Sequence, residues 1–183
     1  EKEKGILKKH HPWIYSEAYK AQGTLKNVGN GTLIDVYASD EKTFIGRGYY
    51  NQYSNISVRI LTGNFEEKID QSFFEKKFRE LSMFRERFID KRDTTAYRVV
   101  FGESDGLPGL IVDRYDQTYV IQIHTAGMEA MKSLIVNAIK KIYSPQTIYE
   151  RSDVKVRLKE GLKECPRQHI FGKEIKGEIK IQN

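Results

Sequence analysis

Short runs in which apolar and polar residues alternate, separated by turn residues, occupy the chain from residue 31 to residue 62. β-Branched and aromatic side chains at every second position are typical of strands that bury one face. Strands this short and this closely spaced favour a small barrel or sandwich. The pattern predicts three strands, at Thr32–Ala38, Phe44–Tyr50 and Ile56–Thr62.

A long amphipathic helix is predicted after this β-rich region. Asp70 can cap its N-terminus, and the helical pattern continues to about Lys91. Apolar side chains recur there at steps of three and four residues, which places them on one stripe of an α-helix. A stripe of this kind is usually buried, so we expect a structural role for Phe74, Phe78, Leu81, Phe84 and Phe88.

The second half of the chain combines strands with another helix. Three strands are expected first, then a helix whose core face runs from Met128 to Ile142, then a further strand. The order strand, strand, strand, helix, strand indicates an α+β domain. The expected strands are Tyr97–Phe101, Leu110–Tyr115, Tyr119–His124 and Thr147–Glu150, and Glu178–Gln182 also alternates like a strand. The domain organisation predicted is residues 1–66, a linking helix within 67–96, and residues 97–183.

The composition is that of a globular protein with a basic bias. The 183 residues carry a net charge of +6, and the segments 1–64, 65–143 and 144–183 contribute +3, 0 and +3. A polyanionic partner is therefore expected near the two ends of the chain. The single cysteine, Cys165, excludes an internal disulfide, and no apolar run approaches the ~20 residues that span a bilayer. We expect a cytoplasmic protein without a membrane contact.

Three motifs suggest chemistry but lack the context that it needs. Gly102–Gly106 matches the G-x-S-x-G nucleophile elbow, yet the residues after Ser104 lead toward another strand instead of a helix. Gly46 and Gly48 lie inside a strand pattern, where close backbone approach or a bulge is expected rather than a phosphate loop. His10 and His11 have no further ligands at metal-binding spacing, so no metal site is predicted.

Basic and aromatic residues interleave in two places. One group, near the start, is Lys8, Lys9, His11, Trp13 and Tyr15. Aromatic rings stack on unpaired bases while lysine and arginine bind phosphates, so this composition suits single-stranded or looped RNA. The same rings could instead be core residues of a small barrel. The second group is Arg47, Tyr49, Tyr50, Tyr53 and Arg59.

Four sequence blocks, in this order, resemble the large-subunit (23S) ribosomal RNA cytosine-C5 methyltransferases. They are Lys9–Ser16 (KHHPWIYS), Ile45–Asn51 (IGRGYYN), Phe101–Tyr115 (FGESDGLPGLIVDRY) and Tyr149–Asp153 (YERSD) with Arg157. The likeness extends from about Lys4 to Gly161. It implies an N-terminal PUA domain with a small β-barrel, followed by the small α+β domain.

The resemblance also implies which parts of the enzyme to expect in this chain. In that family a class I methyltransferase domain follows, so we expect S-adenosylmethionine (SAM) and the catalytic thiolate there, and no catalytic residue or SAM site in these 183 residues. Ribosomal RNA is the implied partner, and a homodimer is an option. Contacts with RNA are expected first from Lys8, Lys9, His11, Trp13, Arg47, Tyr49 and Arg59, and next from Arg151 and Arg157.

Two alternatives belong to other functional classes. A free-standing PUA-type RNA-binding adaptor would share the basic and aromatic groups but have no methyltransferase domain encoded after Asn183. A hydrolase would need Ser104 as nucleophile, with a base and an oxyanion hole that the motif does not provide.

Overall fold

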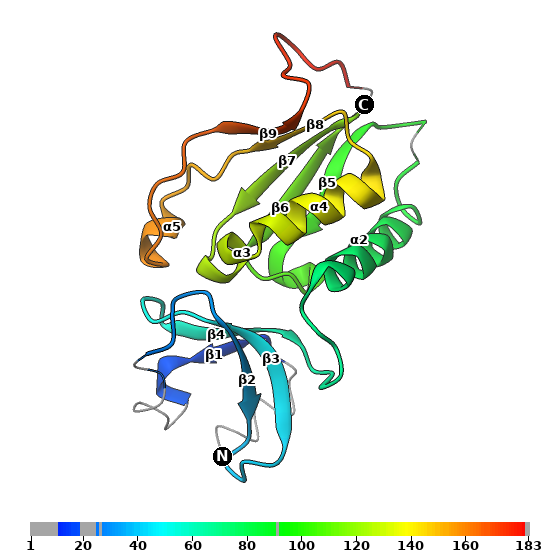
Figure 1. Ribbon diagram of the computed structural model, residues 1–183. Coiled ribbons are helices and arrows are strands. Elements are labelled where there is room, and N and C mark those ends of the chain that lie inside the picture. The colour runs from blue at the N-terminus through cyan, green and yellow to red at the C-terminus, as the bar shows by residue number, and fades with distance from the viewer. Residues whose placement is uncertain (1–10, 19–24, 26, 91, 182–183) are drawn as a thin grey trace.

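Two β-sheets organise the structure, a computed structural model that describes residues 11–18, 25, 27–90 and 92–181 (Figure 1). The first sheet has four strands in the order β1-β4-β3-β2, all antiparallel to their neighbours. Its strands are β1 (Trp13–Tyr15), β2 (Leu33–Tyr37), β3 (Phe44–Tyr50) and β4 (Ile56–Thr62), and a short 3-10 turn, η1 (Ser16–Ala18), follows β1. The bounds predicted for β3 and β4 are confirmed, whereas β1 was not predicted.

Two glycines of β3 allow close contact between β3 and β4. A Cβ atom on Gly48 would lie 2.1 Å from the carbonyl oxygen of Arg59, and one on Gly46 would lie 2.7 Å from Cγ2 of Ile60. The register between the two strands also shifts between Arg47 and Gly48. The glycines therefore have the expected structural role.

The helix α2 (Gln71–Arg85) begins at the predicted cap. Asp70 Oδ1 accepts hydrogen bonds from the backbone N–H groups of Ser72 at 2.8 Å and Phe73 at 3.2 Å. Phe74, Phe78 and Leu81 are buried, as the apolar stripe predicts. The other two residues of the predicted stripe, Phe84 and Phe88, are exposed.

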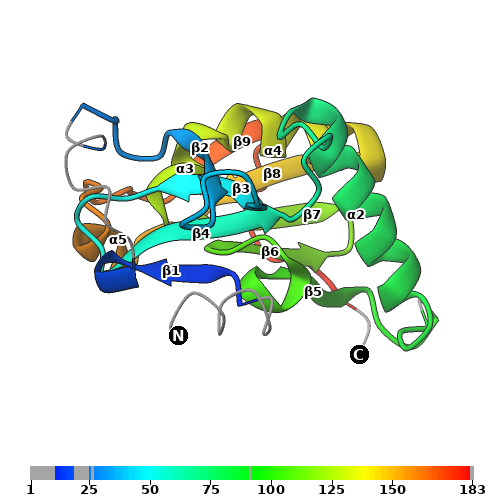
Figure 2. The ribbon, with the colours of Figure 1, turned by 90° about the horizontal axis from the view of Figure 1, so that it is seen from below.

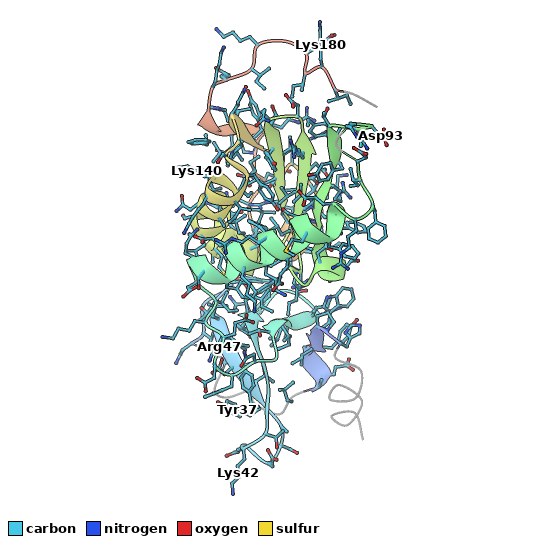
Figure 3. All side chains as sticks on the ribbon, turned by 90° about the vertical axis from the view of Figure 1, so that its right-hand side faces the viewer. Tyr37, Lys42, Arg47, Asp93, Lys140 and Lys180 are labelled. Carbon is cyan, nitrogen blue, oxygen red and sulfur yellow. The ribbon has the colours of Figure 1, made fainter. Side chains whose placement is uncertain are left out.

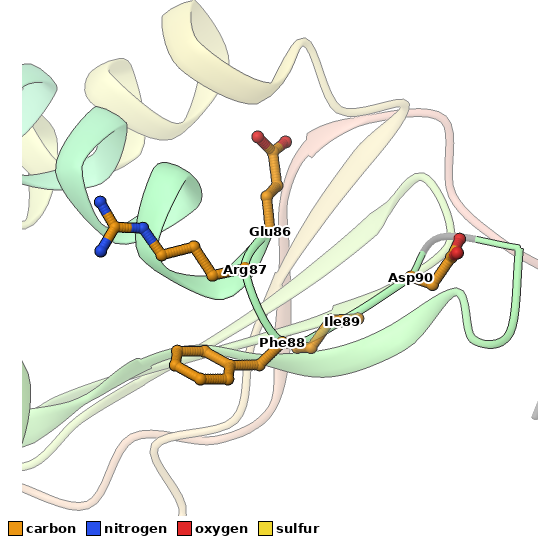
Figure 4. A pocket seen from close by; sticks show the side chains of 5 residues that line it. All are labelled: Glu86, Arg87, Phe88, Ile89 and Asp90. Atoms are coloured by element: carbon orange, nitrogen blue, oxygen red, sulfur yellow. The ribbon is translucent and has the colours of Figure 1, made fainter.

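Phe84 and Phe88 are 48% and 73% exposed. The helix ends at Arg85, six residues earlier than predicted, and Phe88 lies in the turn that follows. Figure 4 shows the surface pocket that Glu86–Asp90 line where the chain leaves the helix. The ring of Phe84 packs on that of Phe88, with centroids 5.3 Å apart, instead of on the core.

The second sheet has five strands in the order β5-β6-β7-β8-β9. Only β7 and β8 are parallel, and two consecutive helices form the crossover that a parallel pair requires. The strands are β5 (Ala96–Phe101), β6 (Leu110–Tyr115), β7 (Thr118–Ile123), β8 (Thr147–Glu150) and β9 (Gln168–Gly172); the helices are α3 (Ala126–Ala130), α4 (Lys132–Tyr143) and α5 (Val156–Lys159), and η2 (Gly102–Asp105) follows β5.

The predicted α+β order is confirmed, with three differences. The single helix expected between β7 and β8 is two helices, and β9 and α5 were not predicted. The strand predicted at Glu178–Gln182 is absent from residues 178–181, the part of it that the structure describes.

The helices α2 and α4 pack side by side on one face of the second sheet (Figures 1 and 2). The main core lies between them and the sheet, and it includes Phe74, Phe78, Val112, Ile121 and Ile139. The residues expected to form a linking helix therefore contribute to this core. None of the helices within the described ranges is long and apolar enough to cross a membrane.

Candidate nucleic-acid interface

An aromatic row, defined as His11, Trp13 and Tyr15, follows the edge strand β1. Strand geometry turns successive side chains to opposite faces, so Ile14 enters the core of the first sheet and its two neighbours face outward. The ring centroids of His11 and Trp13 are 5.4 Å apart, and those of Trp13 and Tyr15 are 6.5 Å apart, all in edge-to-face contact. His11 is exposed and Tyr15 is 47% exposed. The row presents ring surface to solvent at the edge of the sheet.

Trp13 connects this row to the second sheet. Its indole Nε1 donates a hydrogen bond to Glu103 Oε1 at 3.2 Å, and Glu103 lies in η2 directly after β5. The indole is half-buried, so one edge is held while the remaining ring surface stays accessible. Lys8 and Lys9, which were predicted to bind RNA beside Trp13, lie outside the described residues.

Tyr49 was expected to contact RNA, but the structure places it in the core, where its ring cannot reach a base. Its hydroxyl donates to the carbonyl of Pro108 at 2.7 Å and lies 2.9 Å from Oγ1 of Thr125. A Cβ atom on Gly127 would lie 2.0 Å from Cγ of the ring, so only glycine leaves room for it. Burial raises the pKa of Tyr49 far above the ordinary tyrosine value. The side chain joins β3 to the second sheet.

Arg59 was also expected at the RNA surface and is buried instead. Its Nη2 atom lies 2.7 Å from Oε1 of Glu160, and both side chains are almost fully covered. Asn51 donates to the second carboxylate oxygen of Glu160, and Asn30 donates to its backbone carbonyl at 2.9 Å. A buried charge requires such partners, so Arg59 serves the contact between the two sheets.

Glu160 is the residue of this contact that the sequence did not reveal. It follows α5, a four-residue helix with no clear periodic pattern, and it lies 101 positions from Arg59 along the chain. The sequence around either residue does not indicate that the two side chains pair. The buried pair became apparent only from the fold.

Arg157 was expected to contact RNA, but it is also buried. Nη1 donates to the carbonyl of Ile123 at 2.7 Å and to Oε2 of Glu129 at 2.8 Å. These bonds hold the α5 segment against the end of β7 and against α3. The guanidinium is therefore occupied by structural contacts.

Arg47 lies on the first sheet near the start of α2 (Figure 3). It forms a two-point contact with Asp35, at 2.6 Å from Nε and 2.9 Å from Nη2, and donates to the carbonyl of Glu67 at 2.8 Å. The hydrogen bond from Arg47 lowers the pKa of Asp35. All three nitrogens are used within the protein, which leaves Arg47 poorly placed to bind a phosphate.

Arg151, which was also expected to contact RNA, has an accessible side chain. Its side chain is 59% exposed, and its contact with Asp153 is loose, at 3.7 Å. Asp153 is also paired with Arg167 at 2.9 Å. Two arginines thus share one carboxylate on this part of the surface, which leaves a net positive charge.

The motifs with other chemistry acquire no support from the geometry. Ser104 lies in η2, and the chain continues through a turn into β6 without the helix that a nucleophile elbow requires. Burial raises the pKa of Cys165, which makes its thiol less reactive. Across residues 11–18, 25, 27–90 and 92–181, no group of three or more His, Cys, Asp or Glu side chains is arranged to hold a metal ion.

Comparison with known proteins adds two findings on sequence. The family model described as a PUA-like domain matches residues 1–63, which contain the first sheet and the aromatic row. The chain is also 38% identical over 181 residues to a protein named ribosomal RNA large subunit methyltransferase I from Pseudoalteromonas atlantica. A protein of the same name from Aeromonas hydrophila is 41% identical over 164 residues.

Solved structures share the fold. The crystal structure of SMU.776 complexed with SAH superposes with a TM-score of 0.75 at 19% identity, covering 94% of this chain and 41% of that one. A Streptococcus mutans protein assigned as a SAM-dependent methyltransferase gives a TM-score of 0.74 at 19% identity, covering 94% of this chain and 42% of its own. The α+β fold with a PUA-like first part is thereby confirmed.

The alignments cover most of this chain but less than half of each relative. The alignments cover 99% and 89% of this chain but only 44% and 40% of the two curated relatives. The chain is therefore similar, over nearly all its residues, to proteins named ribosomal RNA large subunit methyltransferase I, and it spans about two fifths of their length.

Proposed function

We propose that this chain is the RNA-binding portion of a SAM-dependent methyltransferase that modifies C5 of a cytosine in large-subunit ribosomal RNA. Its role is to hold the RNA, while methyl transfer takes place on a part of the parent protein outside these residues. The observation that carries the proposal is the similarity of nearly the whole chain to proteins named ribosomal RNA large subunit methyltransferase I. The choice of C5 of cytosine rests on the sequence blocks described above.

The aromatic row is the proposed contact for unpaired bases. His11, Trp13 and Tyr15 offer ring surface on a sheet edge, and stacking on a ring contributes about 1–3 kcal/mol per base. Lys8 and Lys9 precede the row in the sequence and would bind phosphates of the same strand. Arg151 is a second proposed phosphate contact.

We also propose that SAM binds elsewhere in the parent protein. A dinucleotide-like or SAM-like pocket needs a glycine-rich turn between a strand and a helix, where backbone N–H groups face the ligand. Gly46 and Gly48 instead pack against β4, and η2 leads into β6. We therefore assign SAM and the catalytic thiolate to the remainder of the parent protein.

RNA binding is tested by fluorescence anisotropy with a labelled ribosomal RNA hairpin that has an unpaired loop. The chain is expected to bind the hairpin with an affinity that falls as salt concentration rises, because bound phosphates release counterions. Calorimetry with SAM on the same sample is expected to give no binding heat. Binding of SAM by these residues would overturn the division of roles.

The reaction is tested on the full parent protein. Incubation with 23S ribosomal RNA and labelled SAM, followed by mass spectrometry of the nucleosides, is expected to give 5-methylcytosine. A methyl group on another base would refute the assigned specificity, and the absence of a methyltransferase domain in the gene beyond Asn183 would favour the adaptor.

A further inference from the structure

A cleft of about 420 Å³ lies at the end of the second sheet farther from the aromatic row. We call it the Arg114 cleft. Trp13 contacts η2, which follows the end of β5, whereas the cleft is lined by Tyr97 near the start of β5 and by the C-terminal part of α4. The residues that matter for its chemistry are Arg79, Ser82, Tyr97, Arg114, Tyr119 and Tyr143.

Arg114 has an incomplete set of partners. Its Nε atom donates to the carbonyl of Asp116 at 2.7 Å, and Nη1 donates to the hydroxyl of Tyr97 at 3.2 Å. The guanidinium carbon lies 5.6 Å from the ring centroid of Tyr97 and 6.0 Å from that of Tyr119. Within the part of the chain that the structure describes, Nη2 has no hydrogen-bond acceptor.

Arg114 also forms no ion pair with another residue that the structure describes. Arg47, Arg59, Arg85 and Arg157 each lie next to a carboxylate. Arg114 is half-buried, and among the described residues no carboxylate lies at ion-pair distance from it, although the charge of Asp116 still acts on it from farther away. A partly desolvated cation without a counterion attracts an anion more strongly than an exposed one.

Tyr97 supplies a second donor beside this cation. Its hydroxyl accepts from Arg114, and its own proton has no acceptor among the residues described. The other two hydroxyl groups already donate within the protein. That of Ser82 donates to the hydroxyl of Tyr143 at 3.1 Å, and that of Tyr143 donates to the carbonyl of Phe78 at 3.0 Å. Among the described residues, Nη2 of Arg114 and the hydroxyl of Tyr97 are therefore adjacent donors without an acceptor.

We propose that the Arg114 cleft binds a phosphate group, held by Nη2 of Arg114 and the hydroxyl of Tyr97. Planar guanidinium groups match the oxygens of a phosphate, and hydrogen bonds between charged partners are the strong ones. Arg79 and Glu86 also line the cleft, and Arg79 is paired with Glu75 at 3.3 Å. The positive charge available to a ligand is therefore small, which suits one phosphate rather than a triphosphate. The phosphate belongs either to the RNA backbone or to a small nucleotide.

The first test titrates inorganic phosphate into the ¹⁵N-labelled chain and follows the resonances of Arg114 and its neighbours. Tyr97→Phe removes one hydrogen bond to the anion and is expected to weaken phosphate binding about tenfold. Tyr115→Phe is the matched control, because Tyr115 adjoins Arg114 in β6 but does not line the cleft. Arg114→Lys keeps the charge without the second nitrogen donor and is also expected to weaken binding.

Parallel titrations with adenosine monophosphate and with the RNA hairpin distinguish the two sources. If the RNA supplies the phosphate, Tyr97→Phe also lowers the affinity for the hairpin. If a nucleotide supplies it, Tyr97→Phe lowers the affinity for the monophosphate and leaves the affinity for the hairpin unchanged. No shift with any of the three probes, or equal effects of Tyr97→Phe and Tyr115→Phe, would overturn the proposal. Because inorganic phosphate is the first probe, this result is independent of RNA binding.

Discussion

At the scale of single residues, arginine side chains divide according to whether a carboxylate neutralises them. Arg59 and Arg157 are buried beside Glu160 and Glu129, and their positive charges are unavailable to an external partner. Arg151 is exposed and only loosely paired, so it can still bind a phosphate. The same distinction among aromatic residues separates Tyr49, which is buried, from Tyr15, which is accessible.

The first prediction compares two exposed tyrosines at opposite edges of the first sheet. Tyr15→Ala removes a ring of the aromatic row and is expected to weaken RNA binding by about fivefold or more, since stacking on a base contributes at least ~1 kcal/mol. Tyr37→Ala, which changes a residue of similar exposure on β2, is the control and should leave affinity unchanged. Equal losses in anisotropy titrations of the two variants would argue against the row.

Sequence reasoning identified residue types better than it identified their surroundings. The interleaved cations and rings were noticed, but Arg47, Tyr49, Arg59 and Arg157 turn out to hold the fold together. Alternation along a strand says which residues share a face and not what covers that face. For Arg59 the covering group, Glu160, comes from a distant part of the chain.

At the scale of elements, the local pattern was sufficient wherever a strand or helix is regular. The bounds of β3, β4, β6 and β8 agree with the predicted ones, because alternation and flanking turns define them. β1 was missed because it has only three residues, and β9 because its residues, QHIFG, do not alternate between apolar and polar; pairing with a neighbouring strand stabilises each of them. The end of α2 was misplaced because charged and apolar residues continue in helical spacing beyond Arg85.

A second prediction compares a buried and an exposed residue of the apolar stripe. Phe78→Ala removes a fully buried ring and is expected to lower the free energy of unfolding by about 3–5 kcal/mol. Phe88→Ala changes an exposed ring and should alter it by no more than about 0.5 kcal/mol. Urea denaturation measures both, and a large loss for Phe88→Ala would mean that this ring is buried.

A third prediction concerns the cap of α2. Asp70→Ala is expected to cost about 1 kcal/mol, as is usual for an N-cap. Hydrogen bonds from Ser72 and Phe73 lower the pKa of Asp70, so the stabilisation is complete above the ordinary aspartate pKa and is lost as pH falls through the lowered value. Denaturation of both proteins between pH 7 and pH 2 should show the difference shrinking with acid; a difference that grows would contradict this sign.

At the scale of the whole molecule, polar contacts join the part built on the first sheet to the part built on the second, two of them buried and one, Trp13 with Glu103, exposed. Tyr49 reaches Pro108, Arg59 reaches Glu160, and Trp13 reaches Glu103, so three strands or turns of the first part bind the second. Contacts of this kind fix the position of the aromatic row relative to η2. A rigid relation between the two parts is what an RNA-positioning role requires.

A fourth prediction tests the strongest of these contacts. Glu160→Ala leaves the guanidinium of Arg59 buried without a partner and is expected to destabilise the protein by about 3–5 kcal/mol. The double variant Arg59→Met with Glu160→Leu replaces the pair by apolar groups and should recover much of that loss. If the single and double variants unfold at the same urea concentration, the pair does not join the two sheets as described.

The most direct measurement of the central claim is photo-crosslinking of a ribosomal RNA hairpin to the chain, with the attachment points mapped by mass spectrometry. The account predicts crosslinks in the peptide that contains His11, Trp13 and Tyr15, and their loss when an unlabelled hairpin competes. Crosslinks confined to the opposite edge of the first sheet, around Tyr37 and Phe44, would contradict it.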